Sequence, residues 1–429
     1  MKYFNTLLSV IICLMPVISC SDFDSKERND SSVDDFSLLT NGLTRSQNEV
    51  ANSLLNFSLN CFREMASDKI DNCLVSPYSL AADLSMLSLG ASGETYNELT
   101  TVLGFEGYSY EQVGDYYSTM TKRVCSSESL LSVANAIWLD NTIEEYVKPE
   151  FKEDVKFFKA DINALDFKSD YSAGIINDWA RAKTSGMIDR IVSIDELQNN
   201  GAIAILTNAI SFNGKWTDNS YSIGDMQFKS LSGKITTKSS FEGRGYCIRE
   251  YNVSGKRKNE PSIVQLKIDD NYSMSFILPP EKKSLKMFVS SLDSEKWVRW
   301  MLSLKPGVTE STVVDFKIPS FQSDAEYQSI KYLENLGIKS LFKESDCNLS
   351  RMINMPVSVS CIKQKTAIDV NSKGSNASSV STIEISQYFG INSSNDTRQK
   401  LEFIADRPFV YAIVENTTQT ILFMGTVTE

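Results

Sequence analysis

The first half of the chain carries apolar residues at helical spacing. From Gln47 to Met65, apolar positions recur every three or four residues, and this period predicts an amphipathic helix. Ser76 and Pro77 begin a second predicted helix, because Ser is a favoured N-cap and Pro is tolerated in the first turn. The same spacing predicts further helices, which run up to Leu103, over Phe151–Phe158 and over Ile175–Lys183.

Strand patterns dominate the second half of the chain. Ala202–Phe212 is almost wholly apolar, as expected for a strand buried on both faces. Ile263–Ile268 and Tyr272–Leu278 flank an Asp-Asp-Asn turn and predict a hairpin. We predict a helix over Tyr327–Leu336 and further strands over Leu130–Leu139, Val313–Ile318, Val357–Val370, Phe409–Val414 and Thr420–Val427. Helices first and strands later predict a mixed α and β fold rather than repeating βαβ units.

A Ser-rich stretch after Asp369 alternates like a strand, although its small polar residues are typical of a loop. Counted from Gly374, every second residue belongs to an uncharged row: Ser375, Ala377, Ser379, Ser381, Ile383 and Ile385. The other row contains Glu384, so only one strand register buries no charge. The pattern predicts a segment that is exposed in one state and inserted into a sheet in another. The alternative is a flexible loop with accidental alternation.

The composition excludes several classes of function. The chain has 429 residues, a formal net charge of -11 and no histidine. Without histidine, Ser-His-Asp and Cys-His nucleophile pairs lack their base, and zinc sites of the usual histidine type are excluded. The acidic balance disfavours nucleic acid, whose phosphates require Lys and Arg. Catalysis by carboxylates or Lys stays open on this ground, but the sequence shows no compact set of such residues, so we expect neither an enzyme nor a bound cofactor or metal.

Residues 1–19 have the features of an export signal. Lys2 precedes an apolar run, Leu7–Val17, that is too short to span a bilayer. The run ends in Val-Ile-Ser-Cys, which resembles the lipobox of bacterial lipoproteins, in which Cys20 would be lipidated and become the N-terminus. An ordinary secretory cleavage site before a cysteine is the alternative.

The segment after Cys20 separates this signal from the folded part of the chain. Residues 20–46 are rich in Ser, Asp and Asn and are predicted to be a disordered tether, and residues 47–429 to form one domain. We expect an exported protein that is lipid-anchored to the bacterial outer membrane, facing the periplasm or the cell surface. Its only expected contact with the membrane is the lipid. The alternative is secretion to the extracellular space.

Several motifs, taken in their order along the chain, resemble the serpin family of serine protease inhibitors. The resemblance begins near residue 47 and extends to the C-terminus, and the ordered set is far more specific than any single motif. The matching blocks are Asn72–Leu80, Leu87–Thr95, Ala134–Trp138, Ile176–Trp179, Lys183–Ile188, Thr207–Trp216, Ile277–Pro279, Leu336–Ile338, Asp346–Ser350, Asp406–Phe409 and Ile421–Gly425.

The resemblance implies a fold with three β-sheets, about nine helices and an exposed reactive loop, here about residues 373–402. It also implies a suicide-substrate mechanism. A protease cleaves the loop, and the loop inserts as a new strand into the large sheet while the protease is still held as an acyl-enzyme. The trapped protease is distorted before it can deacylate.

The resemblance assigns roles to individual residues. Gly374, Ser375, Ala377, Ser379 and Ser381 would form the hinge of the loop, although Ser372 replaces the usual Glu of inhibitory members. A buried polar cluster that controls sheet opening would contain Ser76, Ser79, Asn208 and Gln364, with Gln364 in place of the family's histidine. Trp216 would pack where the loop first enters the sheet. Ser76 could instead only cap its helix, and Trp216 could be an ordinary core aromatic.

The usual spacing from the hinge glycine places the scissile bond at Tyr388-Phe389, but the segment up to Pro408 is longer than usual, and cleavage could fall anywhere in 385–391. An aromatic residue there suits chymotrypsin-like, elastase-like, subtilisin-like or papain-like proteases. We therefore expect a monomeric inhibitor of serine proteases, with cysteine proteases as a second target class. The alternative is a non-inhibitory member of the family that acts as a binding or carrier module.

Overall fold

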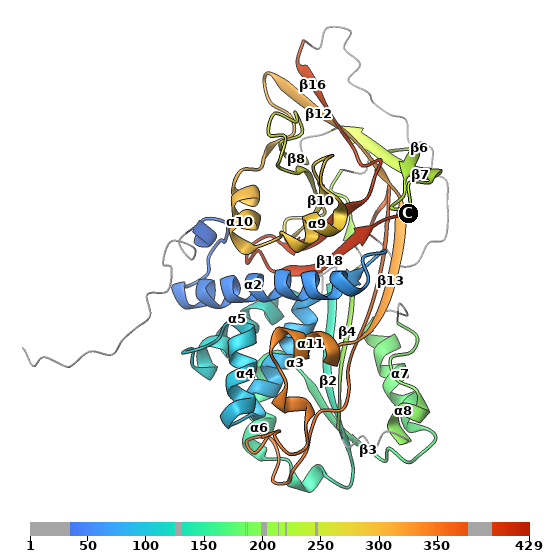
Figure 1. Ribbon diagram of the computed structural model, residues 1–429. Helices are drawn as coiled ribbons and strands as arrows, with labels where there is room; N and C mark the ends of the chain where they lie inside the picture. The colour runs from blue at the N-terminus through green and yellow to red at the C-terminus, as the bar shows by residue number, and fades with distance from the viewer. Residues whose placement is uncertain are drawn as a thin grey trace, which may run out of the picture.

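The computed structural model contains three β-sheets and the helices that cover them (Figure 1). The structure describes residues 35–124, 131–184, 186, 188–198, 204–212, 214–218, 221–244, 248–375 and 397–429. The mixture of helices and strands and the presence of three sheets confirm the predicted fold class.

One seven-stranded sheet, called the central sheet below, leads into the Ser-rich stretch. Its β4 and β14 are parallel, whereas β15 is antiparallel to both of its neighbours. The strand order is β3 (Asp161–Leu165), β2 (Leu131–Asp140), β4 (Ala204–Phe212), β14 (Ile362–Asn371), β15 (Gly374–Ser375) and β5 (Gly214–Lys215), and β13 (Phe321–Gln328) pairs with β14.

A second seven-stranded sheet lies beside it, and its middle strands are buried over their whole length. Its order is β1 (Leu74–Val75), β18 (Ile421–Val427), β17 (Phe409–Glu415), β10 (Tyr272–Leu278), β9 (Ser262–Lys267), β8 (Ile248–Tyr251) and β11 (Lys305–Pro306). The third sheet has four strands: β16 (Gln399–Ile404), β12 (Thr312–Pro319), β7 (Ile235–Arg244) and β6 (Ser222–Lys229).

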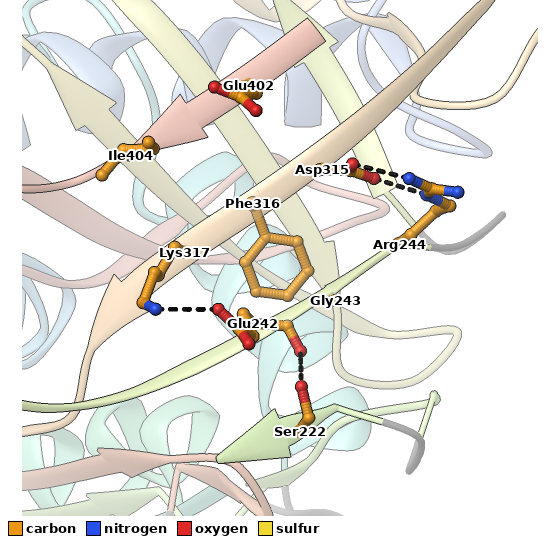
Figure 2. A pocket seen from close by; sticks show the side chains of 9 residues that line it. All are labelled: Ser222, Glu242, Gly243, Arg244, Asp315, Phe316, Lys317, Glu402 and Ile404. Carbon is orange, nitrogen blue, oxygen red and sulfur yellow. Dashed lines mark hydrogen bonds and ion pairs between the residues drawn. The ribbon is translucent and has the colours of Figure 1, made fainter. Parts of the chain in front are cut away.

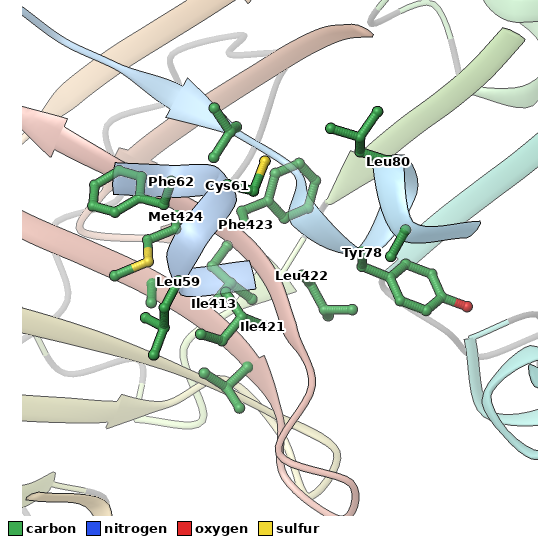
Figure 3. Close-up of a cluster of buried hydrophobic side chains, with 14 of the residues drawn as sticks. Leu59, Cys61, Phe62, Tyr78, Leu80, Ile413, Ile421, Leu422, Phe423 and Met424 are labelled. Carbon is green, nitrogen blue, oxygen red and sulfur yellow. The ribbon is translucent and has the colours of Figure 1, made fainter. Parts of the chain in front are cut away.

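The main core lies between the sheets and a group of helices. Strands β17 and β18 pack there against α2 (Arg45–Asp68) and the wholly buried α3 (Pro77–Gly90), as Figure 3 shows. Thr44 and Gln47 form a capping box that begins α2, and Ser76 caps α3 as predicted. Further helices are α4 (Gly93–Leu103), α5 (Tyr110–Val124), α6 (Pro149–Asp154), α9 (Leu285–Ser290), α10 (Ser294–Leu302) and α11 (Ile330–Leu336). Short 3-10 turns lie at Glu144–Tyr146, Val155–Phe158 and Ser340–Phe342.

Two helices form a cover on the opposite face of the central sheet. They are α7 (Ser172–Lys183) and α8 (Ile194–Gln198), and Figure 1 shows them on the far side of the sheet from α3. Their apolar residues form a small separate core with Trp138 of β2 and Ile205 of β4. We call residues 172–198 the cover segment.

Most predicted elements are present with small shifts at their ends, but three expectations are corrected. Tyr327 belongs to strand β13, which ends at Gln328, and the helix expected from Tyr327 begins only at Ile330. The long strand expected from Val357 begins at Ile362. The sequence reasoning made no prediction for the β6–β7 hairpin or for α9 and α10.

The third correction concerns the predicted tether. Its residues 35–46 contact the domain: Phe36 is fully buried, and the Asn41 amide donates to the Thr417 carbonyl at 2.9 Å. A single aromatic residue within a polar stretch thus docks part of the segment onto the core. Residues 1–34, which include the predicted export signal and Cys20, lie outside the described residues.

Candidate functional site

The upper end of the central sheet is where β15 lies between β14 and β5. After Asn371 the chain turns back, and the Lys373 amide donates to Asn371 Oδ1 at 2.9 Å. Gly374 and Ser375 then pair with Asn371 and Val370 on one side and with Lys215 and Gly214 on the other. The first two residues of the predicted hinge are therefore already a strand of the sheet.

Only glycine fits at position 374. Its φ of +142° is a conformation that side-chain-bearing residues rarely adopt, and a Cβ there would lie 2.0 Å from the Gly214 carbonyl oxygen. The close approach of two backbones explains why the hinge begins with this residue.

Trp216 joins the hinge to the sheet. Its indole Nε1 donates to the Asn371 carbonyl at 2.8 Å, directly before the turn. The ring is buried and stacks on Phe241 with a centroid distance of 5.8 Å. Trp216 therefore does both things considered for it, since it belongs to the core and contacts the point where the loop leaves the sheet.

The lower end of the central sheet is closed. Residues Leu206–Ala209 of β4 pair directly with Ile362–Lys365 of β14. Among the described strand pairs, none joins residues 366–369 of β14 to β4. The two strands therefore meet below and are separate above, where β15 begins.

A buried polar cluster lies behind this closed segment. The Gln364 side-chain amide donates to the Ser76 carbonyl at 2.7 Å and accepts from the Ser76 amide at 3.0 Å. Ser76 Oγ donates to the Leu422 carbonyl at 2.7 Å and lies 2.9 Å from Ser79 Oγ. Gln364 thus joins β14 to the N-terminus of α3, and Ser76 both caps that helix and belongs to the cluster.

The structure brings together only part of the predicted set. The Asn208 backbone lies between Asn135 of β2 and Gln364 of β14, and its side chain is outside the described residues. Also outside them are Ala377, Ser379, Ser381, Tyr388 and Phe389. Of the predicted hinge, the structure thus describes only the first two residues, Gly374 and Ser375.

Three polar residues near the closed segment escaped the sequence reasoning. Thr366 Oγ1 donates to the Leu74 carbonyl at 3.2 Å, and Lys363 forms ion pairs that we describe below. Alternation along β14 could have revealed Thr366, since it shares a buried face with Ile362 and Ile368. The third is Asp83, which lies one helical turn after Ser79 on α3.

Asp83 has a buried side chain, and one of its carboxyl oxygens, Oδ1, lacks a hydrogen-bond partner among the described residues. Burial raises its pKa to about 8, because the charged form cannot be solvated there. The carboxyl is therefore largely protonated at neutral pH.

A pocket opens over the third sheet, as Figure 2 shows. Two cross-strand ion pairs line it: Arg244 with Asp315, and Lys317 with Glu242 at 3.0 Å. Such ladders of opposite charges stabilise strand surfaces, so we assign no chemistry to the pocket. Elsewhere in the described part of the chain, no group of three or more His, Cys, Asp or Glu residues could hold a metal ion, and no helix is long and apolar enough to cross a membrane.

The central sheet has β14 paired with β4 below and holds a two-residue strand from the start of the Ser-rich stretch above, within a fold of three sheets covered by helices. The family pattern described as serpin (serine protease inhibitor) matches residues 52–429, and the chain belongs to this family.

The relatives agree over most of their length. Serpin B8 of Bos taurus is 28% identical over 385 residues, which cover 86% of this chain and 96% of that protein. Glia-derived nexin of Mus musculus is 28% identical, with 83% and 87% covered. The solved native structure of tengpin, a thermophilic serpin, superposes with a TM-score of 0.75 at 26% identity and covers 89% of this chain and 94% of that one. Family membership supports protease inhibition in general, although some serpins are non-inhibitory.

Proposed function

We propose that this protein is an irreversible suicide-substrate inhibitor of serine endopeptidases, with papain-like cysteine endopeptidases as a second target class. The nucleophilic oxygen or sulfur of the protease attacks the carbonyl carbon of Tyr388. The bond to the Phe389 nitrogen breaks, and the new amine takes up a proton and leaves. The cleaved loop then inserts between β4 and β14 before water can release the acyl-enzyme.

The observation that carries this proposal is the contrast between the two ends of the central sheet. A strand has begun at the upper end, antiparallel to β14 and β5, and at the lower end β14 pairs with β4, the strand that precedes β5 in the chain. Extension of β15 would exchange one parallel pairing for two antiparallel ones. We infer that insertion would give an arrangement of lower energy, which the loop could reach once cleavage frees one of its ends.

The register of β15 also agrees with the uncharged row of the loop. Val370 pairs with Ser375, so continued antiparallel pairing would set Ile368, Thr366 and Gln364 opposite residues 377, 379 and 381. The three β14 residues are buried on the inner face of the sheet. Directly opposite residues share a face, so the register would bury the uncharged row and leave Glu384 outside.

We extend the proposal to location and assembly from the sequence alone. Residues 1–19 act as a lipoprotein signal, Cys20 carries the lipid, and the inhibitor is monomeric and held at the outer membrane. Metabolic labelling with a fatty acid, lost in the Cys20→Ser variant, would support the anchor. Release of unlabelled wild-type protein into the medium would contradict it.

The direct test is to mix the chain from residue 35 onward with chymotrypsin, pancreatic elastase, subtilisin and papain. We expect a complex that survives boiling in detergent, with the cleavage site found by mass spectrometry of the released peptide. Ser379→Glu places a charge in the uncharged row and should abolish the complex, whereas Ser378→Glu in the other row should retain it.

The alternative function has a distinct outcome in the same experiment. Clean cleavage of the loop while the protease keeps full activity would identify a non-inhibitory serpin that acts as a binding or carrier module. Ser372 at the hinge, where inhibitory members usually carry Glu, is the sequence feature that favours this alternative.

A further inference from the structure

Lys363 lies in the short segment where β14 pairs directly with β4. It is the β14 residue that pairs with Thr207 of β4, on the face of the sheet opposite the buried Gln364. Any strand that enters between β4 and β14 must separate this pair.

Two carboxylates hold the Lys363 ammonium. Glu196 of the cover segment forms a hydrogen-bonded ion pair with it, and Glu326 of β13 lies 3.1 Å away. The lysine side chain is only 15% exposed. Burial disfavours the charge of Lys363, but its bonds to Glu196 and Glu326 prevail and raise its pKa. The ammonium therefore remains charged at neutral pH.

Glu196 is itself fixed within the cover segment. Its Oε2 accepts from the Ser193 amide at 2.7 Å and from Ser193 Oγ at 2.9 Å, while Oε1 binds Lys363. A single carboxylate thus joins the start of α8 to β14. Lys365 makes a second polar contact of this kind, since its Nζ donates to the Arg190 carbonyl at 3.1 Å.

The apolar contacts of the cover segment lie elsewhere. Its small core includes Trp138 of β2 and Ile205 of β4 and, among the described residues, no member of β14. Trp138 Nε1 also donates to Thr207 Oγ1 of β4 at 2.9 Å. The cover segment is therefore packed on β2 and β4 but joined to β14 through polar groups.

This division predicts what strand insertion does to each ion pair. A new strand moves β4 and β14 apart by one strand spacing, about 4.8 Å. Glu196 would move with β4, whereas Glu326 would move with β14, because β13 remains paired to it. The Glu196–Lys363 pair would break and the Glu326–Lys363 pair would persist.

We propose that the Glu196–Lys363 ion pair acts as a latch that holds β14 next to β4. Rupture of this ion pair limits the rate at which a strand enters the central sheet. The latch rests on the proposed function, because it regulates the same insertion. It can nevertheless be tested without a protease.

The test uses the chain from residue 35 onward and a synthetic peptide of residues 375–386, which carries the uncharged row. Annealing of the peptide is followed by native electrophoresis and by the melting temperature of the product. We expect Glu196→Gln and Lys363→Met to accelerate annealing about fivefold, in line with the loss of one partly buried ion pair. Glu153→Gln, which removes an exposed ion pair with Lys156, should leave the rate unchanged.

Glu326→Gln distinguishes a latch from a contact that merely stabilises the fold. It removes the other partner of the same lysine, so it should lower the melting temperature of the intact protein as much as Glu196→Gln does, without accelerating annealing. Equal rates in Glu196→Gln and wild type, or equal acceleration by both Gln variants, would overturn the latch. Failure of the peptide to anneal to any variant would also overturn it, because the sheet would then not open.

The outcomes separate the latch from the inhibitory function. If the wild type forms no detergent-stable protease complex, but the Glu196→Gln variant anneals the peptide faster than the wild type, the protein is a non-inhibitory serpin with a working latch. If the wild type and the variant both trap protease and do so at equal rates, the protein is an inhibitor without a latch.

Discussion

The two ends of the central sheet differ in which strand lies beside β14. At the upper end, Gly374 and Ser375 lie between β14 and β5, and Trp216 holds the turn before them. At the lower end, β4 and β14 pair with each other, with the Gln364 cluster behind them and the Glu196–Lys363 ion pair in front. A strand can therefore begin only from above and must displace polar contacts as it descends.

A second contrast concerns the two cores. The main core joins α2 and α3 to several sheets, whereas the cover segment rests on a small patch of β2 and β4. Since hydrophobic stabilisation grows with the apolar area buried, the cover segment should be the easier of the two to move. If a strand enters the central sheet, we therefore expect the cover segment to shift and the main core to stay in place.

The largest expected effect comes from filling the sheet. Limited cleavage of the loop, at any bond in 385–391, should raise the melting temperature by about 10 °C. An inserted strand adds about ten main-chain hydrogen bonds at about 1 kcal/mol each, and each kcal/mol shifts the melting temperature of a domain of this size by about 1 °C. Calorimetry of intact and cleaved protein measures this; an unchanged melting temperature would mean that the loop does not insert.

Asp83→Asn tests the helix behind the lower end. The folded pKa of Asp83 lies near 8 and the unfolded value near 3.8, so its contribution is complete below the unfolded value and is lost as the pH rises toward 8. At roughly 1.4 kcal/mol per pH unit, wild type should lose about 4 kcal/mol between pH 4 and pH 7 through this group.

The asparagine variant should not show this loss. Urea unfolding at pH 4, 5.5 and 7 should give equal stabilities for the two proteins at pH 4 and a widening advantage for the variant above it. Parallel pH profiles for the two proteins would refute the assignment.

Gln364→Met removes both hydrogen bonds to Ser76 at similar volume. The Ser76 amide would lose its partner in the core, at a cost of about 2 kcal/mol, and the Ser76 carbonyl would keep only the bond from the Leu80 amide. Gln322→Met is the matched control, because Gln322 bonds Asp369 on a partly exposed edge of the same sheet. The denaturant midpoints of the two variants measure their losses of stability. Equal losses would mean that the hydrogen bonds of the Gln364 cluster stabilise the protein no more than the partly exposed bond of Gln322 does.

Gly374→Ala acts on the upper end alone. The added Cβ clashes with the backbone of β5, so β15 should leave the sheet at a cost of about 1 kcal/mol of global stability. Hydrogen exchange of the amides in 370–375 should become faster while the amides of β18 keep their protection. Gly233→Ala has a strained φ but open space, and it should leave the exchange of 370–375 unchanged.

The last prediction concerns the pH dependence of strand insertion, which we expect to be nearly absent. Gln364 cannot gain a proton near neutral pH, so the rate of insertion should vary less than about twofold between pH 5 and 8. Gln364→His should introduce a step below about pH 6.5, because burial lowers the pKa of the imidazole and its ionisation would weaken the cluster. A steep step in the wild type would contradict the prediction.

The sequence predicted most of the elements because each carries its own local signal. The period of α2, the Ser76-Pro77 cap and the apolar run of β4 were sufficient. Tyr327 was assigned to a helix because the apolar spacing around it fits both structures, and only pairing with β14 makes it a strand residue. Phe36 was missed because one aromatic in a polar segment gives no period.

The site shows the same division. Alternation is a local property, and along the chain it predicts the two rows of the loop, whereas the hinge glycine and the polar residues of the cluster are predicted only from the resemblance to serpins. Only the tertiary structure decided that β15 has already entered the sheet, that Gln364 bonds the backbone of Ser76, and that Glu196 reaches Lys363. These contacts join residues up to 288 positions apart, and their partners are chosen by the packing of whole strands and helices.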